Sequence, residues 1–148
     1  MSSEISSGAK SEAQPQAQPQ DRPEAQPAVH RGSCHCGAVR FEVLTSVEPA
    51  TRCNCSLCRR RGALMTPAFP EANLRILAGR DALTLYQFNT RVAQHYFCKH
   101  CGIYPFHAAR TMPGMWRANV GCLEDVADPY AIDHGVADGK TLSVVEDA

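Results

Sequence analysis

Seven of the eight cysteines in this 148-residue chain stand in three short clusters, and their spacing constrains the fold more than any other feature. The clusters are Cys34 with Cys36, Cys53 with Cys55 and Cys58, and Cys98 with Cys101. Cys122 stands alone. In a reducing compartment, compact groups of cysteines indicate metal or redox chemistry rather than a disulfide framework.

The third cluster has the form of a zinc knuckle. Two residues separate Cys98 from Cys101, and Gly102 follows at the point where the tight turn often needs a positive φ. A closed tetrahedral site needs four ligands, and one knuckle supplies two. We therefore expect the other compact pair, Cys34 and Cys36, to complete a four-cysteine site.

The second cluster has no fourth cysteine beside Cys53, Cys55 and Cys58. Three protein ligands and an open position are typical of a catalytic zinc, where water or substrate takes the fourth place. A site rich in thiolates also favours a soft ligand such as a substrate thiol. The spacing thus predicts two zinc ions per chain, one structural and one functional.

Other interpretations of these residues stay open. A lone Cys-x-x-Cys can be a thioredoxin-like redox pair, and the second site could be structural if His95, His100 or His107 completed it. We expect His95 and His107 to be strand or pocket residues, and His35 and His100, which lie between ligands, to point away from the metal. Cys122 lies in an apolar run, and we expect it to be a small buried residue of the core.

The remaining pattern favours short strands. Residues 38–43 alternate apolar and polar side chains, which is the period of a half-buried strand. Further strands are expected over residues 74–77, 83–88, 94–97 and 116–120, with residues 89–91 as a hairpin connection. Helical signal is weak and limited to a turn or two after Cys55. We expect a mostly β domain that takes much of its stability from metal.

The first 28 residues differ in composition from the rest. They are rich in Gln, Pro and Ala and contain no aromatic residue, so we expect a disordered tail over residues 1–28 and a zinc-binding domain over residues 29–148. The tail shows no signal-peptide pattern, and no apolar stretch could span a membrane, which together predict a cytoplasmic location.

Charge argues against a polyanion partner. The net charge is zero, and residues 29–148 carry 13 basic against 11 acidic side chains. Dedicated binders of nucleic acid or membrane surfaces usually present a strongly basic face, so we expect neither partner. Exposed strand edges in a small β domain leave formation of a homo-oligomer open.

The cysteine motifs resemble those of the glutathione-dependent formaldehyde-activating enzyme family, whose domain also occurs in centromere protein V. Residues 32–41, 53–59 and 96–105 carry the resemblance. It implies a β-tent fold of stacked antiparallel sheets built around zinc knuckles. It also implies one zinc on Cys34, Cys36, Cys98 and Cys101, and a second on Cys53, Cys55 and Cys58 near a glutathione site.

The activity implied by the resemblance is that of S-(hydroxymethyl)glutathione synthase, a carbon–sulfur lyase that joins glutathione to formaldehyde. Because Arg59, Arg60 and Arg61 follow the second cluster directly, they are candidates to bind the two carboxylates of glutathione. The same arginines could simply form a solvated loop. The alternative function is a non-enzymatic, zinc-stabilised binding module of the centromere protein V type.

Overall fold

The structure is a computed structural model that describes residues 25–142. Residues 1–24, which contain most of the predicted tail, and residues 143–148 lie outside the described part. The strands are β1 (Ala28–Ser33), β2 (Arg40–Thr45), β3 (Ala50–Cys53), β4 (Phe69–Pro70), β5 (Leu74–Ala78), β6 (Leu83–Tyr86), β7 (Gln94–Cys98), β8 (Phe106–Ala108), β9 (Met115–Ala118) and β10 (His134–Ala137). The helices are α1 (Ser56–Arg61) and the short 3-10 helices η2 (Glu71–Asn73), η3 (Arg80–Ala82), η4 (Val120–Cys122), η5 (Pro129–Ala131) and η6 (Lys140–Leu142).

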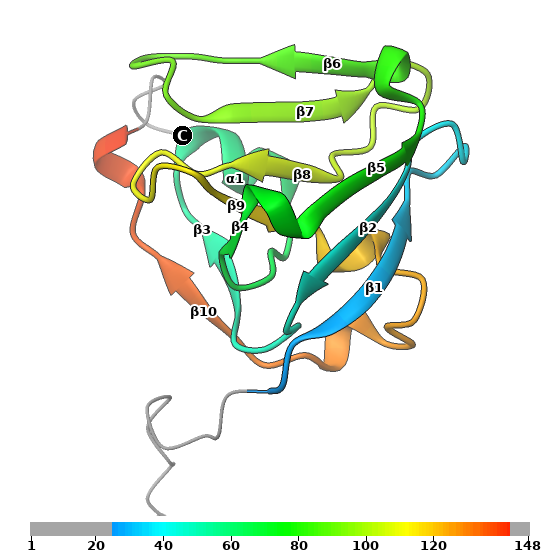
Figure 1. Cartoon of the computed structure of the whole chain (residues 1–148). Helices are drawn as coiled ribbons and strands as arrows, with labels where there is room; N and C mark the ends of the chain where they lie inside the picture. The colour runs from blue at the N-terminus through cyan, green and yellow to red at the C-terminus, as the bar shows by residue number, and fades with distance from the viewer. Residues whose placement is uncertain (1–24, 143–148) are drawn as a thin grey trace, which may run out of the picture.

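Two antiparallel sheets form the body of the domain, as Figure 1 shows. The larger has the strand order β4-β9-β8-β7-β6 and lies across the top of that view, and the smaller has the order β1-β2-β5. A separate pair, β3 with β10, is parallel. The expectation of a mostly β fold of stacked antiparallel sheets is confirmed, and the parallel pair was not predicted.

The core lies where the two large sheets face each other. Phe41 and Val43 of β2 are fully buried because alternate residues of this strand point inward. The ring of Phe41 meets that of Phe106 of β8 edge-on, with centroids 5.3 Å apart. Gly32 of β1 passes so close to Phe41 that a Cβ there would lie 2.3 Å from the ring, so the residue must be glycine.

Most of the predicted strands are present. The segments predicted over residues 74–77, 83–88 and 94–97 correspond to β5, β6 and β7, and β6 pairs with β7 as an antiparallel hairpin. The short helix predicted after Cys55 is α1. No helix within residues 25–142 is long and apolar enough to cross a bilayer.

Several predicted strand boundaries differ from the structure: β6 ends at Tyr86 and not at residue 88, and β2 runs to Thr45 and not to residue 43. Two further boundaries are wrong because a local turn takes over. The strand predicted from residue 38 starts at Arg40, since Cys34 N–H bonds Val39 O at 3.0 Å and closes a turn with Gly37 at φ 77°. The strand predicted to reach residue 120 ends at Ala118. The Asn119 side chain there accepts from the N–H of Gly121 and caps η4.

Two cysteine clusters and a cavity beside the second

The four-cysteine cluster joins the turn between β1 and β2 to the end of β7. The four Sγ atoms of Cys34, Cys36, Cys98 and Cys101 all lie within 4.8 Å of one another. Cys36 Sγ is 3.6 Å from Cys34 Sγ and 3.8 Å from Cys98 Sγ. Four sulfurs bound to zinc at about 2.3 Å make a tetrahedron with edges of about 3.8 Å. The donor set and its spacing therefore fit a tetrahedral zinc.

Backbone N–H groups support the thiolates of this cluster. Val39 N–H points at Cys34 Sγ at 3.3 Å. The pKa of the Cys101 thiol is lowered to about 6, chiefly by a hydrogen bond from the backbone N–H of Cys36. Gly102 has φ 74° and returns its N–H to Cys98 O at 2.7 Å, which is the knuckle turn predicted from the sequence.

The three-cysteine cluster is built on the passage from β3 into α1. Cys53 ends β3, Cys55 is the N-cap of α1, and Cys58 is in the first turn of that helix. The Cys55 sulfur accepts from Cys58 N–H at 3.4 Å, in the place where serine or aspartate usually caps a helix. The three Sγ atoms lie within 4.8 Å of one another, and no other Cys, His, Asp or Glu in residues 25–142 joins them at that spacing.

A proton is unevenly shared within this cluster. The pKa of Cys53 is lowered to about 5, first by a hydrogen bond from the Cys58 side chain. The same hydrogen bond, with burial, raises the pKa of Cys58. The cluster can therefore carry negative charge at neutral pH before any cation binds.

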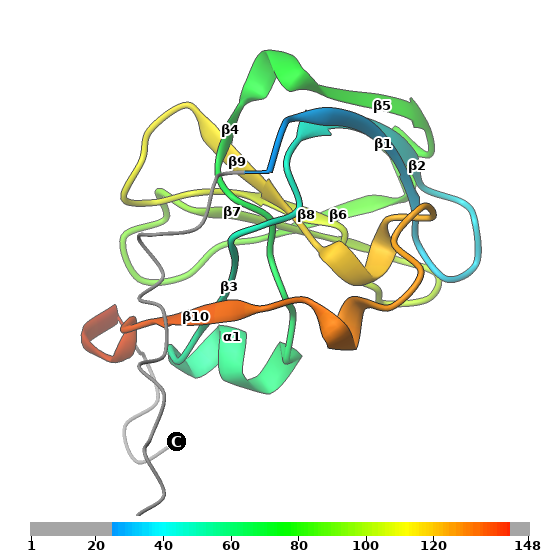
Figure 2. The same cartoon turned by 90° about the horizontal axis from the view of Figure 1, so that it is seen from below.

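Residues 134–142, which we term the strap, hold the three-cysteine loop from outside. The strap begins with β10, which lies beside β3 in Figures 1 and 2. Asn54 fastens its far end: its side-chain oxygen accepts from Gly139 N–H at 2.7 Å, and its amide donates to Asp138 at 3.2 Å. A Cβ at Gly139 would lie 2.6 Å from Cys53 Sγ, so the strap sits directly against the cluster.

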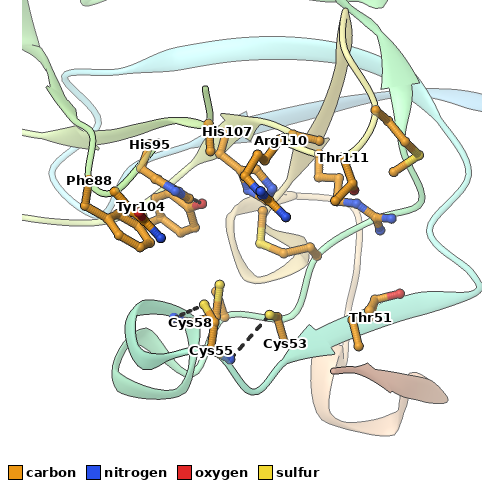
Figure 3. Close-up of a pocket in the computed structure, with 18 of the residues that line it drawn as sticks. Thr51, Cys53, Cys55, Cys58, Phe88, His95, Tyr104, His107, Arg110 and Thr111 are labelled. Atoms are coloured by element: carbon orange, nitrogen blue, oxygen red, sulfur yellow. Dashed lines mark hydrogen bonds between the residues drawn. The ribbon is translucent and has the colours of Figure 1, made fainter. Parts of the chain in front are cut away.

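A cavity of about 200 Å³ opens beside the three cysteines. Figure 3 shows the cysteines on one side, with His95, Tyr104, His107 and Arg110 across from them. The lining also includes small and apolar side chains, among them Ala63, Met65, Phe88, Ala93, Ala109, Met112 and Ala137. The four-cysteine cluster contributes no residue to this lining. Of the two clusters, the three-cysteine cluster therefore faces this cavity, which a ligand could enter.

Tyr104 is the centre of the wall opposite the cysteines. Its hydroxyl and Nδ1 of His95 form a hydrogen bond of 2.8 Å. Its ring stacks on His107 with centroids 5.8 Å apart and planes 3° apart. The guanidinium of Arg61 lies over the ring, 4.0 Å from its centroid, in a cation–π contact. The hydroxyl is thus held in one place by contacts on several sides.

Burial sets the protonation of this wall. It lowers the pKa of His95 to about 4 and that of His107 to about 3, with further lowering of both by the positive charge of Arg61. It also raises the pKa of the Tyr104 hydroxyl. At neutral pH both imidazoles are therefore uncharged and Tyr104 keeps its proton.

The predicted substrate-binding arginines lie on α1. Arg59 and Arg60 are exposed, and Arg60 donates to Ser56 O at 2.8 Å along the helix. Arg61 turns inward onto Tyr104. None of the three is among the residues that line the cavity. Their contact with a substrate carboxylate stays a prediction.

The other predicted residues are placed as follows. His95 and His107 are on strands and line the cavity, as expected. His35 and His100 are exposed and belong to neither cluster. Cys122 is buried in the core cluster with Phe41 and Trp116 and is 7% exposed, which confirms its predicted apolar role.

Three residues of the site were not predicted: Tyr104, Arg110 and Asn54. Asn54 stands between two cysteines in the sequence, so its position was a usable signal. Tyr104 and Arg110 flank β8 and reach the cavity only through the pairing of β7, β8 and β9. Tyr104 lies within the cysteine motif over residues 96–105, but nothing in that motif marks it as a cavity residue, and no local pattern marks Arg110.

The fold and the site define a class of protein: a small β domain with one cluster of four cysteines and a second cluster, of three, that faces a cavity. The sequence model of the family described as glutathione-dependent formaldehyde-activating enzyme matches residues 29–135. The chain belongs to this family, and the resemblance of its cysteine motifs is confirmed.

Two similar proteins extend the comparison. A Halomonas elongata protein, provisionally named a glutathione-dependent formaldehyde-activating enzyme, is 35% identical over 78 residues. That match covers 47% of this chain and 50% of the relative, so the chain spans about half the length of the curated relative it matches. The crystal structure of a Rhodobacter sphaeroides protein is similar with a TM-score of 0.64 and 44% identity, over 71% of this chain and 99% of that one.

Proposed function

We propose that this chain is a zinc-dependent enzyme of the carbon–sulfur lyase class that joins the sulfur of glutathione, or of a related thiol, to formaldehyde. The observation that carries the proposal is the three-cysteine cluster, which lacks a fourth ligand among the described residues and faces a cavity. Membership of the formaldehyde-activating family supports the choice of substrates.

The two clusters have different roles in this proposal. Cys34, Cys36, Cys98 and Cys101 would hold a structural zinc, because their four sulfurs complete a tetrahedron. Cys53, Cys55 and Cys58 would hold the second zinc. When bound there, zinc lowers the pKa of an added thiol and so supplies a thiolate at neutral pH.

The chemical step needs a thiolate and a proton for the carbonyl oxygen. A sulfur lone pair forms the bond to carbon, the π pair of the carbonyl moves to oxygen, and the oxygen takes a proton in place of the one that the thiol released. Tyr104 holds a proton at the cavity wall, and His95 is hydrogen-bonded to its hydroxyl. This pair would transfer the proton to the oxygen. The apolar part of the lining would exclude water that competes for it.

The proposal includes the predicted partners and location. Glutathione is the expected thiol, with Arg59, Arg60 and Arg61 as the predicted contacts of its carboxylates. A near-neutral domain gives no reason to expect nucleic acid or a membrane. We also propose that the protein works in the cytoplasm, where its cysteines stay reduced.

Metal counting and a rate measurement test the proposal together. Native mass spectrometry of the reduced protein, without and with glutathione, should give two zinc ions and a glutathione adduct. Exchange NMR should show faster formation of S-hydroxymethylglutathione than in buffer alone. Cys55→Ser should keep one zinc and lose the acceleration. Cys122→Ser is the matched control and should keep both zincs. Two zincs with no response to glutathione and no acceleration would favour the binding-module alternative.

A further inference from the structure

Two unpaired nitrogen atoms lie on the wall across from the three cysteines. Nδ1 of His107 and Nε of Arg110 are buried and have no hydrogen-bond partner within the described residues. Both residues line the cavity. Buried polar nitrogens are costly to leave unpaired, so native proteins generally satisfy them with protein, water or a ligand. Unpaired nitrogens in a cavity wall therefore indicate that something polar binds between them and the cysteines.

The charge of the cavity wall indicates which kind of polar group binds there. The lining contains two cations, Arg110 and Arg117, and no Asp or Glu. Arg117 is already engaged, since its guanidinium donates to Thr66 O at 3.0 Å. Figure 3 shows the guanidinium of Arg110 extending into the cavity on the side across from Cys53 and Cys58. Arg110 thus presents a positive charge that has no carboxylate partner among the lining residues, and its planar donors match a carboxylate.

The size of the cavity restricts how the ligand is held. Its volume of about 200 Å³ is below the range of about 300–1,000 Å³ that is usual for pockets enclosing a whole ligand. The enclosed part of the ligand must therefore carry both the sulfur and the anion. The remainder of a larger thiol such as glutathione would extend out of the opening.

We propose that Arg110 is the specificity-determining residue of this site and selects thiols that carry a carboxylate. The sulfur of the ligand lies at the three-cysteine cluster, and the carboxylate accepts from the guanidinium of Arg110 across the cavity. This inference rests on the proposed function, because it places a thiol at that cluster. It assigns the anion contact to a residue of the β8–β9 loop, in place of Arg59 and Arg60 on the exposed side of α1.

Two probes that differ only in charge test this selection. The zinc-loaded protein is titrated by calorimetry with 3-mercaptopropionate and with its neutral amide, 3-mercaptopropionamide. The wild type should bind the acid about tenfold to a hundredfold more tightly, which is the range for one charge-assisted contact. Arg110→Met should bring this ratio to about one while the amide affinity and the zinc count stay the same. If the methionine variant does not fold, Arg110→Gln is measured against the same criterion.

Arg59→Met is the matched control, since it removes the same side chain outside the cavity, and it should keep the preference for the acid. The inference is overturned if the wild type binds both probes equally, or if the preference survives in the Arg110 variant. Loss of the preference in Arg59→Met alone would assign the contact to α1 instead. If neither thiol binds to zinc-loaded wild type, the proposed function fails and the inference fails with it. Equal binding of both thiols refutes the inference alone.

Discussion

Adding one methyl group at Gly139 tests whether the strap fixes the geometry of the three-cysteine cluster. Gly139 is buried, its backbone has no positive φ, and a Cβ there would lie 2.6 Å from Cys53 Sγ and 3.0 Å from Cys55 Cβ. The backbone at residue 139 can therefore adopt its conformation with alanine, but the added Cβ would clash with the cluster. Either the cysteines or the strap must move.

The size of the effect follows from the overlap. Non-bonded carbon contacts are comfortable at about 3.5–4.0 Å, so the contact with Cys53 Sγ requires a shift of roughly 1 Å. Overpacking of this kind costs about 1–3 kcal/mol. If the strain falls on the cluster, its zinc affinity decreases roughly fivefold to 150-fold, at 1.4 kcal/mol per factor of ten.

The assay is competition with a zinc chelator, read by native mass spectrometry so that each occupancy is counted. Gly139→Ala should weaken one zinc and leave the other unchanged, because the three atoms nearest to the added Cβ belong to Cys53 and Cys55 of the three-cysteine cluster. Gly135→Ala is the matched control: it is in the same strap, also lacks a positive φ, and has no atom within 4 Å of the added Cβ. It should weaken neither zinc.

The reasoning would be refuted by a Gly139→Ala protein that keeps both zincs at wild-type affinity. In that case the strap yields instead of the cluster, and the hydrogen bond from Gly139 N–H to Asn54 breaks. Faster hydrogen exchange of the backbone amide at position 139 than in the wild type would identify this outcome. Equal weakening of both zincs would show that the strain spreads through the whole domain.

Three further predictions concern the clusters and the cavity wall. Cys98→Ser, at a fully buried position of the closed cluster, should unfold the domain in thermal melts, whereas Cys55→Ser should leave the fold intact; unfolding of both would make the second cluster structural too. Tyr104→Phe should slow hydroxymethyl transfer about a hundredfold without changing thiol affinity, and an unchanged rate would exclude Tyr104 as proton donor. In NMR titrations His95 and His107 should protonate only near pH 4 and pH 3. Because the unfolded chain binds protons below about pH 6.5 while these folded imidazoles do not, the free energy of unfolding should fall from there toward pH 4; titration near 6.5 would contradict their burial.

The cysteine clusters could be predicted because their signal is local. Spacing alone separates Cys98 and Cys101 from the three-cysteine cluster. Because a closed site needs four ligands, Cys34 and Cys36 are assigned to the four-cysteine cluster. The strands with clear periodicity could be predicted for the same reason. β10 could not, because all four of its residues are exposed and carry no apolar period.

The cavity wall could not be predicted because distant segments meet there. Arg110 reaches it through the register of β8 with β9, and nothing near Arg110 in the sequence marks that position. The arginines after Cys58 were predicted to bind substrate because they adjoin a cluster. The rotation of α1 turns Arg59 and Arg60 outward, while Arg61, three residues after Cys58, shares its face of the helix.

The four-cysteine cluster also has a consequence for assembly of the domain. Cys36 and Cys98 are 62 residues apart, and the whole second cluster lies within the loop that they delimit. A covalent link across a loop of that length lowers the entropy of the unfolded chain by the equivalent of about 4 kcal/mol, and a metal clip acts in the same sense. Capture of one zinc would thus shorten the search by which β3 meets β7 and β8. Zinc binding at the four-cysteine cluster would then favour formation of the cavity during folding.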